Sequence, residues 1–179
     1  MKFISSLLFL FGGLTASAAV IEKRATSSFH LYAYGTGIGG LPIYYSDGNA
    51  FVGNKIPSGS TVNTNITFAP SSSSEWIITP TTANVTLTNS KSSALFINPS
   101  SKALTNVGFT ASDSSTVATR GFLAFGNWAM WKSPDTSQIS SSFYATPVSD
   151  GIWQLKWNAD EMDDGSSVGV AIRKMAPSS

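Results

Sequence analysis

Two apolar runs flank an Asp-Gly pair in the stretch Leu41-Pro42-Ile43-Tyr44-Tyr45-Ser46-Asp47-Gly48-Asn49-Ala50-Phe51-Val52-Gly53. A tight hairpin turn needs residues that accept a positive φ, and glycine, aspartate and asparagine are the residues that do so most readily. The stretch therefore predicts two antiparallel strands joined by a short turn.

A second hairpin is predicted towards the C-terminus. Residues 142–146 and 152–157 read as strands, and Pro147-Val148-Ser149-Asp150-Gly151 supplies the turn between them. Apolar and polar residues alternate in the second run, as expected for a strand with one buried face.

The rest of the chain also reads as strand and turn. No window of helical length keeps a period of 3.6 residues without Gly, Pro or clusters of Ser and Thr. We expect one all-β domain, built as a β-sandwich of the jelly-roll kind or as a β-barrel. Because the chain contains no cysteine, this fold has no disulfides. Further strands are expected at residues 28–34, 62–68, 75–79, 84–88, 94–97, 104–110, 120–125, 128–131 and 167–173, with loops at 71–74 and 134–141.

The first 24 residues have the pattern of export and processing signals. Residues 1–18 predict a signal peptide that is cleaved after Ala18, since a positive start and an apolar stretch precede Ala16-Ser17-Ala18. Residues 19–24 predict a short propeptide that ends in the dibasic pair Lys23-Arg24. The domain would then span residues 25–179. We expect a secreted protein, extracellular or associated with the cell wall, without a membrane anchor.

Two N-glycosylation sequons agree with secretion. They are Asn65-Ile66-Thr67 and Asn84-Val85-Thr86, and both lie in strand-like alternation. Around the first sequon, Val62, Ile66 and Phe68 should point to one face and Asn65 to the other, so that a glycan on Asn65 would lie on the solvent side.

Composition excludes several classes of function. The formal net charge is only +1, so nucleic acid is not expected as a partner. The chain has a single histidine, His30, and no cysteine, so neither a zinc site nor thiol chemistry is predicted. The glycines from Gly35 to Gly40 match a dinucleotide fingerprint, but a strand follows them instead of a helix. We interpret them as a connection, and we predict no cofactor.

Carboxylates are the remaining candidates for catalysis or metal binding. Glu75 lies beside Trp76, and an apolar ring next to a carboxyl group raises its pKa, as a catalytic acid requires. The acidic cluster Asp160, Asp163 and Asp164 offers oxygen ligands of the kind that calcium prefers. A solvated acidic loop is the other interpretation of this cluster.

Aromatic residues are candidates for a binding surface. Trp153 and Trp157 share one face of a strand and could form either a sugar platform or part of the core. Trp131 and Trp128 should lie on opposite faces, so one of the two is expected to be exposed. Tyr44 and Tyr45 also lie on opposite faces, and a shallow aromatic groove could result.

Three segments resemble small secreted proteins of filamentous ascomycete fungi. They are Phe29-His30-Leu31-Tyr32-Ala33-Tyr34-Gly35, the stretch from Gly39 to Gly53, and Asp150-Gly151-Ile152-Trp153-Gln154-Leu155-Lys156-Trp157-Asn158. The resemblance implies a fungal source, secretion and a β fold, and it brings no catalytic residues with it.

We therefore expect a secreted, non-enzymatic β-protein that acts at the cell wall or at a host surface, as an elicitor, an effector or a wall-associated protein. Its expected partner is a cell-wall polysaccharide or an extracellular host protein. A polysaccharide-binding module that uses Trp131, Trp153 or Trp157 is the alternative. A glycoside hydrolase that uses Glu75 is the third hypothesis.

Overall fold

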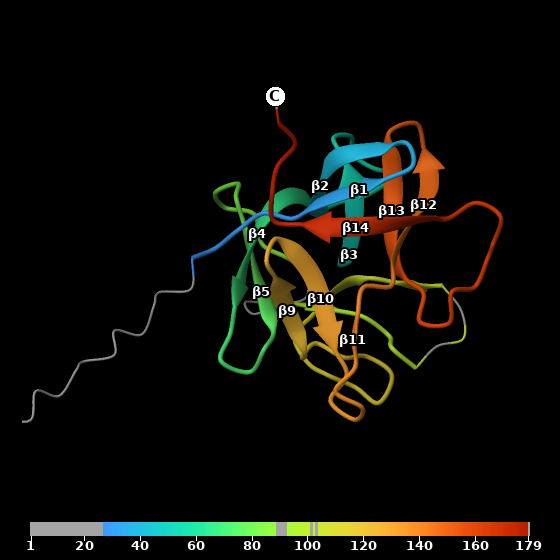
Figure 1. Ribbon diagram of the computed structural model, residues 1–179. Coiled ribbons are helices and arrows are strands. Elements are labelled where there is room, and N and C mark those ends of the chain that lie inside the picture. Colours follow the sequence, from blue (N-terminus) through green and yellow to red (C-terminus); the bar gives the residue numbers. More distant parts are fainter. Residues whose placement is uncertain (1–26, 89–92, 101, 103, 179) are drawn as a thin grey trace, which may run out of the picture.

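The computed structural model describes residues 27–88, 93–100, 102 and 104–178 of the 179-residue chain. Within this part, the chain forms fourteen β-strands and no helix (Figure 1). The all-β prediction is confirmed. The strands are β1 (Tyr32–Gly35), β2 (Ile38–Ser46), β3 (Asn49–Gly53), β4 (Asn63–Pro70), β5 (Trp76–Pro80), β6 (Ala94–Phe96), β7 (Thr105–Asn106), β8 (Gly108–Thr110), β9 (Phe122–Phe125), β10 (Trp128–Lys132), β11 (Ile139–Ser140), β12 (Phe143–Ser149), β13 (Ile152–Trp157) and β14 (Val168–Arg173).

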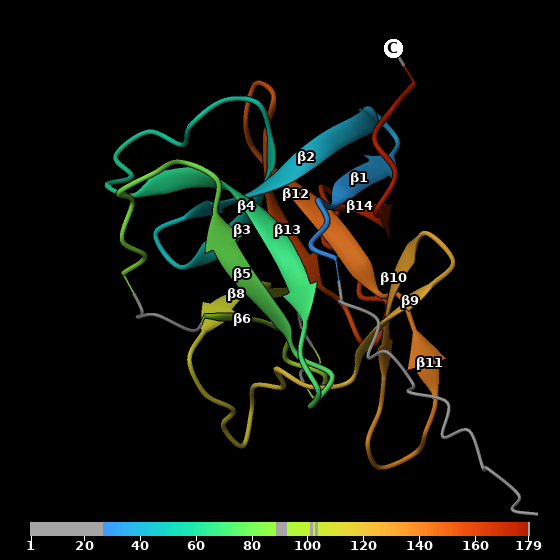
Figure 2. The ribbon, with the colours of Figure 1, turned by 90° about the vertical axis from the view of Figure 1, so that its left-hand side faces the viewer.

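Six strands pair in a closed ring. The antiparallel pairings run from β1 to β2, β3, β13, β12 and β14, and β14 pairs with β1 again. A sheet whose pairings return to their starting strand is a barrel, and closure removes the free edges of those strands. Outside the ring, β10 pairs with β14, and β9 and β11 flank β10 (Figure 2).

Four further strands form a second path that begins and ends on the same hairpin. From β2 the pairings lead through β4, β5, β6 and β8 to β3. The last step is the single pair Asn49↔Gly108. The β2–β3 hairpin therefore belongs to both closed paths.

The turn of this hairpin has the geometry that the sequence predicts. Asp47 and Gly48 both have positive φ, 43° and 85°, and Ser46 pairs with Asn49 across the turn. Two central residues with positive φ match the right-handed twist of paired strands. The Asp47 carboxylate also accepts hydrogen bonds from the backbone N–H groups of Thr61 and Val62, each at 2.8 Å. It thereby holds the chain that leads into β4.

The core is rich in aromatic residues. The Trp157 ring meets those of Phe143 and Trp131 edge to face, with centroids 5.0 and 6.0 Å apart. The Trp76 ring lies near those of Phe68 and Phe122. Without disulfides, burial of apolar area and these ring contacts must supply much of the stability. The largest fully buried side chains are Trp76, Trp157, Tyr45, Phe68, Phe109, Phe143, Leu31, Ile38, Ile66, Leu95, Ile97 and Leu155.

Two local predictions differ from the structure. Residues 84–88 do not form a strand; Asn84 has a φ of 64° and lies in a turn. Asparagine adopts this left-handed conformation more easily than other residues with a side chain, and local turn geometry outweighs the alternating pattern there. A short strand, β11, lies within the predicted loop 134–141 because it pairs with Trp131 and Lys132.

Two further predictions concern the glycine run at residues 35–40 and the first 24 residues. The glycine run connects two strands and leads into no helix, as predicted, but the turn itself is only Thr36-Gly37: Gly35 ends β1, and Gly39 and Gly40 already lie in β2. The predicted signal peptide and propeptide, with Ala18, Lys23 and Arg24, lie outside the described residues. Among the described residues, no helix is long and apolar enough to cross a membrane.

Replacing Asp47 by alanine should lower the free energy of unfolding by about 1–3 kcal/mol, because two backbone donors lose a charged acceptor. Urea unfolding followed by tryptophan fluorescence measures the change. Asp150→Ala is the matched control, since Asp150 also precedes a turn glycine but its exposed carboxylate bonds only Lys55. The control should leave the urea midpoint almost unchanged, and equal losses in the two variants would contradict this role of Asp47.

Candidate functional site

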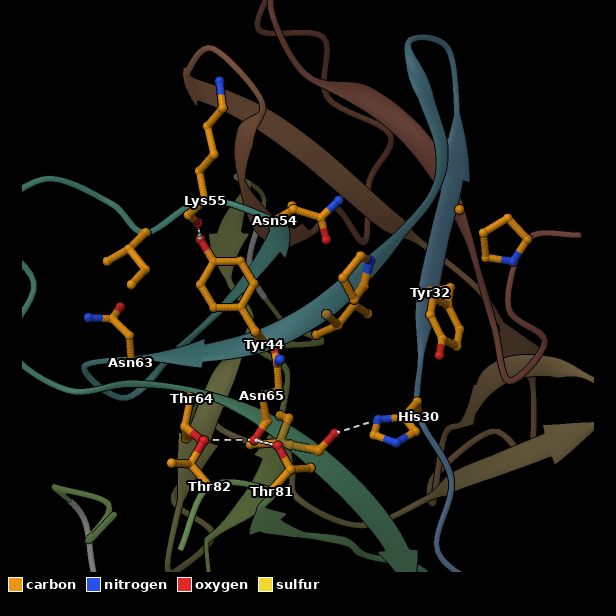
Figure 3. A pocket seen from close by; sticks show the side chains of 17 residues that line it. His30, Tyr32, Tyr44, Asn54, Lys55, Asn63, Thr64, Asn65, Thr81 and Thr82 are labelled. Atoms are coloured by element: carbon orange, nitrogen blue, oxygen red, sulfur yellow. Dashed lines mark hydrogen bonds between the residues drawn. The ribbon is translucent and has the colours of Figure 1, made fainter. Parts of the chain in front are cut away.

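An open groove of about 780 Å³ lies on the outer face of the sheet (Figure 3). It lies where one edge of β2 changes its partner. Pro42 in the first half of β2 pairs with Tyr32 of β1, and Tyr44 in the second half pairs with Asn65 of β4. The described residues that line it are His30, Tyr32, Gly40, Pro42, Ile43, Tyr44, Gly53, Asn54, Lys55, Ile56, Asn63, Thr64, Asn65, Ile66, Thr81, Thr82 and Pro177.

Strand alternation explains why polar and aromatic side chains gather in this groove. On β4, Thr64, Ile66 and Phe68 are buried, whereas Asn65 is exposed. The predicted division between Ile66 and Phe68 on one side and Asn65 on the other is therefore confirmed. The same period of two places Tyr32 on the outer face of β1, next to buried Leu31 and Ala33.

A segment after β3 forms one wall of the groove. Gly53 has a φ of 141°, and a Cβ atom there would collide with the carbonyl oxygen of Gly151, so glycine is required where the chain leaves β3. The Tyr44 hydroxyl then donates a hydrogen bond of 2.7 Å to the carbonyl oxygen of Lys55. Tyr44 is only 4% exposed, and this burial raises the pKa of its phenol to about 12. The phenol thus remains a neutral donor that fixes the wall.

Tyr32 is the aromatic side chain that remains half-exposed in the groove. Its ring centroid lies 6.5 Å from that of His30. Figure 3 shows Tyr32 and His30 on one side of the groove, facing Tyr44 and Asn65 on the other. A half-exposed ring offers an apolar surface to a ligand.

Several polar groups of the groove make no hydrogen bond to the described residues. They are the side-chain amides of Asn54 and Asn65 and the hydroxyls of Tyr32 and Thr82. By contrast, the Asn63 side chain accepts a hydrogen bond from Ser60, and both the N–H and the hydroxyl of Thr81 donate to the Asn65 carbonyl oxygen. The groove therefore combines a firmly bonded backbone with free amides and hydroxyls.

Little charge is available in the groove. His30 places Nδ1 3.0 Å from the carbonyl oxygen of Ile66, which orients its ring. The Lys55 ammonium pairs with Asp150 at 2.7 Å. Among the described lining residues there is no aspartate or glutamate. Without a carboxylate, the groove lacks the groups that hydrolyse glycosidic bonds in most glycosidases.

Glu75 lies elsewhere, in a network of hydroxyls and charges. Its carboxylate accepts hydrogen bonds from the hydroxyls of Ser73, at 2.7 Å, and Thr119, at 3.4 Å. The Arg120 guanidinium lies 3.5 Å from both Glu75 and Asp113. The bond from Ser73 is the main reason why the pKa of Glu75 is lowered.

The expected rise in the pKa of Glu75 is therefore wrong. Glu75 directly precedes β5, and its carboxylate accepts bonds from the hydroxyls of Ser71, Ser73 and Thr119, whereas the Trp76 side chain is buried in the core. Asp113 also has a lowered pKa, first because of its bond from the Thr119 hydroxyl. Both groups are ionised at neutral pH, and neither is suited to protonate a leaving group.

The tryptophans that were candidates for a sugar platform lie mainly in the core. Trp157 is 1% exposed and Trp131 is 7% exposed, so both belong to the core, and the Trp131 indole donates to the Arg120 carbonyl oxygen at 2.8 Å. Trp153 is half-buried and packs against the same core. The burial of Trp157 and the packing of Trp153 support the interpretation that these two residues belong to the core. Trp128, 39% exposed, is the tryptophan that reaches the surface on β10.

The acidic cluster uses its carboxylates to shape a loop. Asp163 accepts a hydrogen bond from the N–H of Gly165, and Asp164 accepts bonds from the backbone of Ser166 and Ser167. These bonds lower the pKa of Asp164. Asp160 makes no side-chain bond to the described residues. Within the described ranges, no group of three metal-ligating side chains comes together, in this loop or elsewhere.

Comparison with protein-family models, curated proteins and solved structures finds no match to this chain. The geometry of the groove is therefore the basis for assigning a function.

Sequence reasoning found only part of this groove. It singled out Tyr44 for an aromatic groove and Asn65 as a solvent-facing sequon, and both line the site. It missed Tyr32, Asn54 and Thr82. The alternation of residues 28–34 carries a signal for Tyr32, because Leu31 and Ala33 mark the inner face. Asn54 and Thr82 lie just beyond strand ends, where no periodicity applies.

The carboxylates of Glu75 and Asp113 should make stability depend on acid pH. Folding lowers the pKa of both carboxyl groups. Their contribution to the free energy of unfolding is therefore complete above the pKa values of the unfolded chain, near pH 4. It is lost as the pH falls through the lower pKa values of the folded protein. The melting temperature should therefore decrease on acidification below about pH 4, and Asp113→Asn should flatten the decrease. Asp135→Asn, on an exposed loop, is the control; curves of equal slope for wild type and Asp113→Asn would refute the effect.

Proposed function

We propose that the protein is a secreted, non-enzymatic glycan-binding protein whose groove holds an uncharged polysaccharide chain at a cell wall or host surface. The observation that carries the proposal is the lining of the groove. It combines the half-exposed Tyr32 ring with free amides and hydroxyls, and its described residues include no carboxylate.

The chemistry of a sugar matches this lining. One face of a pyranose ring presents C–H groups that pack against an aromatic ring, and Tyr32 offers such a surface. Sugar hydroxyls both donate and accept hydrogen bonds, as do the amides of Asn54 and Asn65 and the hydroxyl of Thr82. A polymer needs an open site, because the chain must extend beyond the bound units, and this groove is open along the sheet.

Charge favours a neutral ligand. Acidic polysaccharides require free cations, but the Lys55 ammonium is paired with Asp150. The groove is therefore suited to neutral glucans or to chitin. The predicted secretion and the resemblance to small secreted fungal proteins support a fungal wall polymer or a host wall polymer as the source.

Binding is favoured over hydrolysis by the position of the acids. Glycoside hydrolysis generally needs one carboxyl group that stays protonated and a second that is ionised, both flanking the bond. Glu75 and Asp113 share Arg120 and lie outside the groove.

An extracellular protein partner is the second candidate, and a separate surface favours it. Phe125 and Trp128 form a cross-strand pair beside the β9–β10 turn and are 67% and 39% exposed. Arg173 lies over the Trp128 ring at 4.2 Å. Exposed aromatic residues next to arginine are typical of the centres of protein interfaces.

In protein produced without N-glycans, replacing Tyr32 by alanine should weaken binding to insoluble β-glucan, chitin or cellulose roughly tenfold, because the stacking surface is lost. Depletion of the protein from solution measures binding, and soluble sugar is assayed in the same tubes. Tyr144→Ala is the matched control, since Tyr144 is also half-buried on a strand but does not line the groove.

Several results would decide against the proposal. Equal retention of the two variants would remove the groove as the binding site. Release of soluble sugar that Glu75→Gln abolishes would establish a glycosidase. If no polymer retains the protein, the Phe125–Trp128 surface becomes the leading site, and leaf infiltration with pure protein tests for a host response.

A further inference from the structure

One sequon acceptor lies inside the groove itself. Asn65 lines the groove on β4, directly opposite Tyr44 of β2 in the antiparallel register. Its side chain is exposed and makes no hydrogen bond to the described residues. Figure 3 shows the Asn65 side chain between Tyr44 and the Thr81–Thr82 segment. A group attached to this amide would begin on the floor of the groove.

We propose that Asn65 carries an N-linked glycan that occupies the groove and blocks it, so that the modification switches glycan binding off. This inference rests on the proposed function, because a groove that fits neutral sugars also fits the protein's own sugars. In the modification, Asn65 Nδ2 bonds to C1 of the first sugar of a lipid-diphosphate-linked oligosaccharide. The bond from C1 to the diphosphate oxygen breaks, and the amide loses one proton.

The surroundings of Asn65 suit the first sugars of such a glycan. Asn63 lies two residues away on the same face of β4, which is about 7 Å. His30 is also close, since its Nδ1 atom contacts the carbonyl oxygen of Ile66, the next residue. Tyr32 lies beside His30. A chain that leaves Asn65 therefore lies close to Tyr32, the ring that the proposed function assigns to an external glycan.

A tethered sugar competes at a high effective concentration. Short flexible tethers give effective concentrations in the millimolar range, so a tethered sugar can fill a site whose intrinsic affinity is weak. The volume that the tethered sugar fills is also closed to other ligands. We expect glycosylation at Asn65 to reduce the affinity for an external oligosaccharide at least about tenfold.

The chain contains its own matched control. Asn84 is the acceptor of the second sequon; it is exposed and lies in a turn with a φ of 64°, and it does not line the groove. A glycan on Asn84 adds similar mass and chemistry without starting from the groove floor. Loss of this glycan should leave the groove unaffected.

His30 supplies a signal that does not depend on any added ligand. It is the single histidine of the chain, so an untagged protein gives one histidine Hε1 resonance in a proton NMR spectrum. Because His30 lines the groove, a sugar seated there should shift that resonance.

The experiment compares four proteins secreted from a eukaryotic host: wild type, Thr67→Ala, Thr67→Ser and Thr86→Ala. Thr67→Ala removes the first sequon and keeps Asn65, Thr67→Ser restores the sequon, and Thr86→Ala removes the second sequon. Mass spectrometry gives the occupancy of each asparagine. The His30 resonance and the affinities for soluble β-glucan, chitin and cellulose oligosaccharides are then measured.

We expect Asn65 to be occupied in every protein except Thr67→Ala. Thr67→Ala should bind oligosaccharide at least about tenfold more tightly than the others and should show a different His30 resonance. An unmodified Asn65 in the wild type would overturn the proposal. So would an affinity and a His30 resonance that Thr67→Ala leaves unchanged.

The two proposals fail in different ways. If Thr67→Ala and the glycosylated wild type bind oligosaccharide with equal affinity, the Asn65 glycan does not block the groove. The proposed function then stands. If no protein binds any saccharide, the proposed function fails. In that case a difference in the His30 resonance between wild type and Thr67→Ala still supports a glycan seated in the groove. An identical resonance in the two proteins refutes it.

Discussion

Strand β2 makes the pairing on which the rest of the structure depends. One of its edges pairs with β3, and its other edge pairs first with β1 and then with β4. Because a strand has only two edges, a strand that serves three partners must change partner along one of them. The change of partner separates β1 from β4 on the surface and creates the groove. The Asp47-Gly48 turn fixes the register of β2 and therefore the position of every residue at this junction.

The local elements could be predicted from the sequence because each depends on neighbours in the chain. The Asp-Gly turn and the alternation on β4 are such cases, and both are found as expected. The order of the strands could not be predicted, because pairings such as β1 with β14 join opposite ends of the chain. The groove depends on that order, and so only single members of it, Tyr44 and Asn65, were identified. The sequence also does not show which of Trp131 and Trp128 is exposed. The two lie on opposite faces of the same strand, and only the position of the core decides which face is buried.

Aromatic residues and acids have different environments from those that their sequence neighbours suggest. Trp157 and Trp131 contact each other from strands that do not pair, so neither ring is free to serve as a platform. Glu75 follows a run of serines, and these hydroxyls determine its environment more than the adjacent Trp76 does. In both cases residues brought close by the fold decide the chemistry. The groove, in contrast, presents exposed amides and hydroxyls that bond no described residue and are accessible from solvent.

The pairing of β1 with β14 also governs when the molecule can fold. Tyr32 pairs with Arg173, so the ring closes only after the last strand has left the ribosome and, for an exported chain, the translocation channel. Until then β1 and β12 keep unpaired edges, which are sites of unwanted association between chains. Contacts between distant parts of a sequence also form slowly. These two edges therefore stay open to other chains until β14 has been made and has paired with both strands.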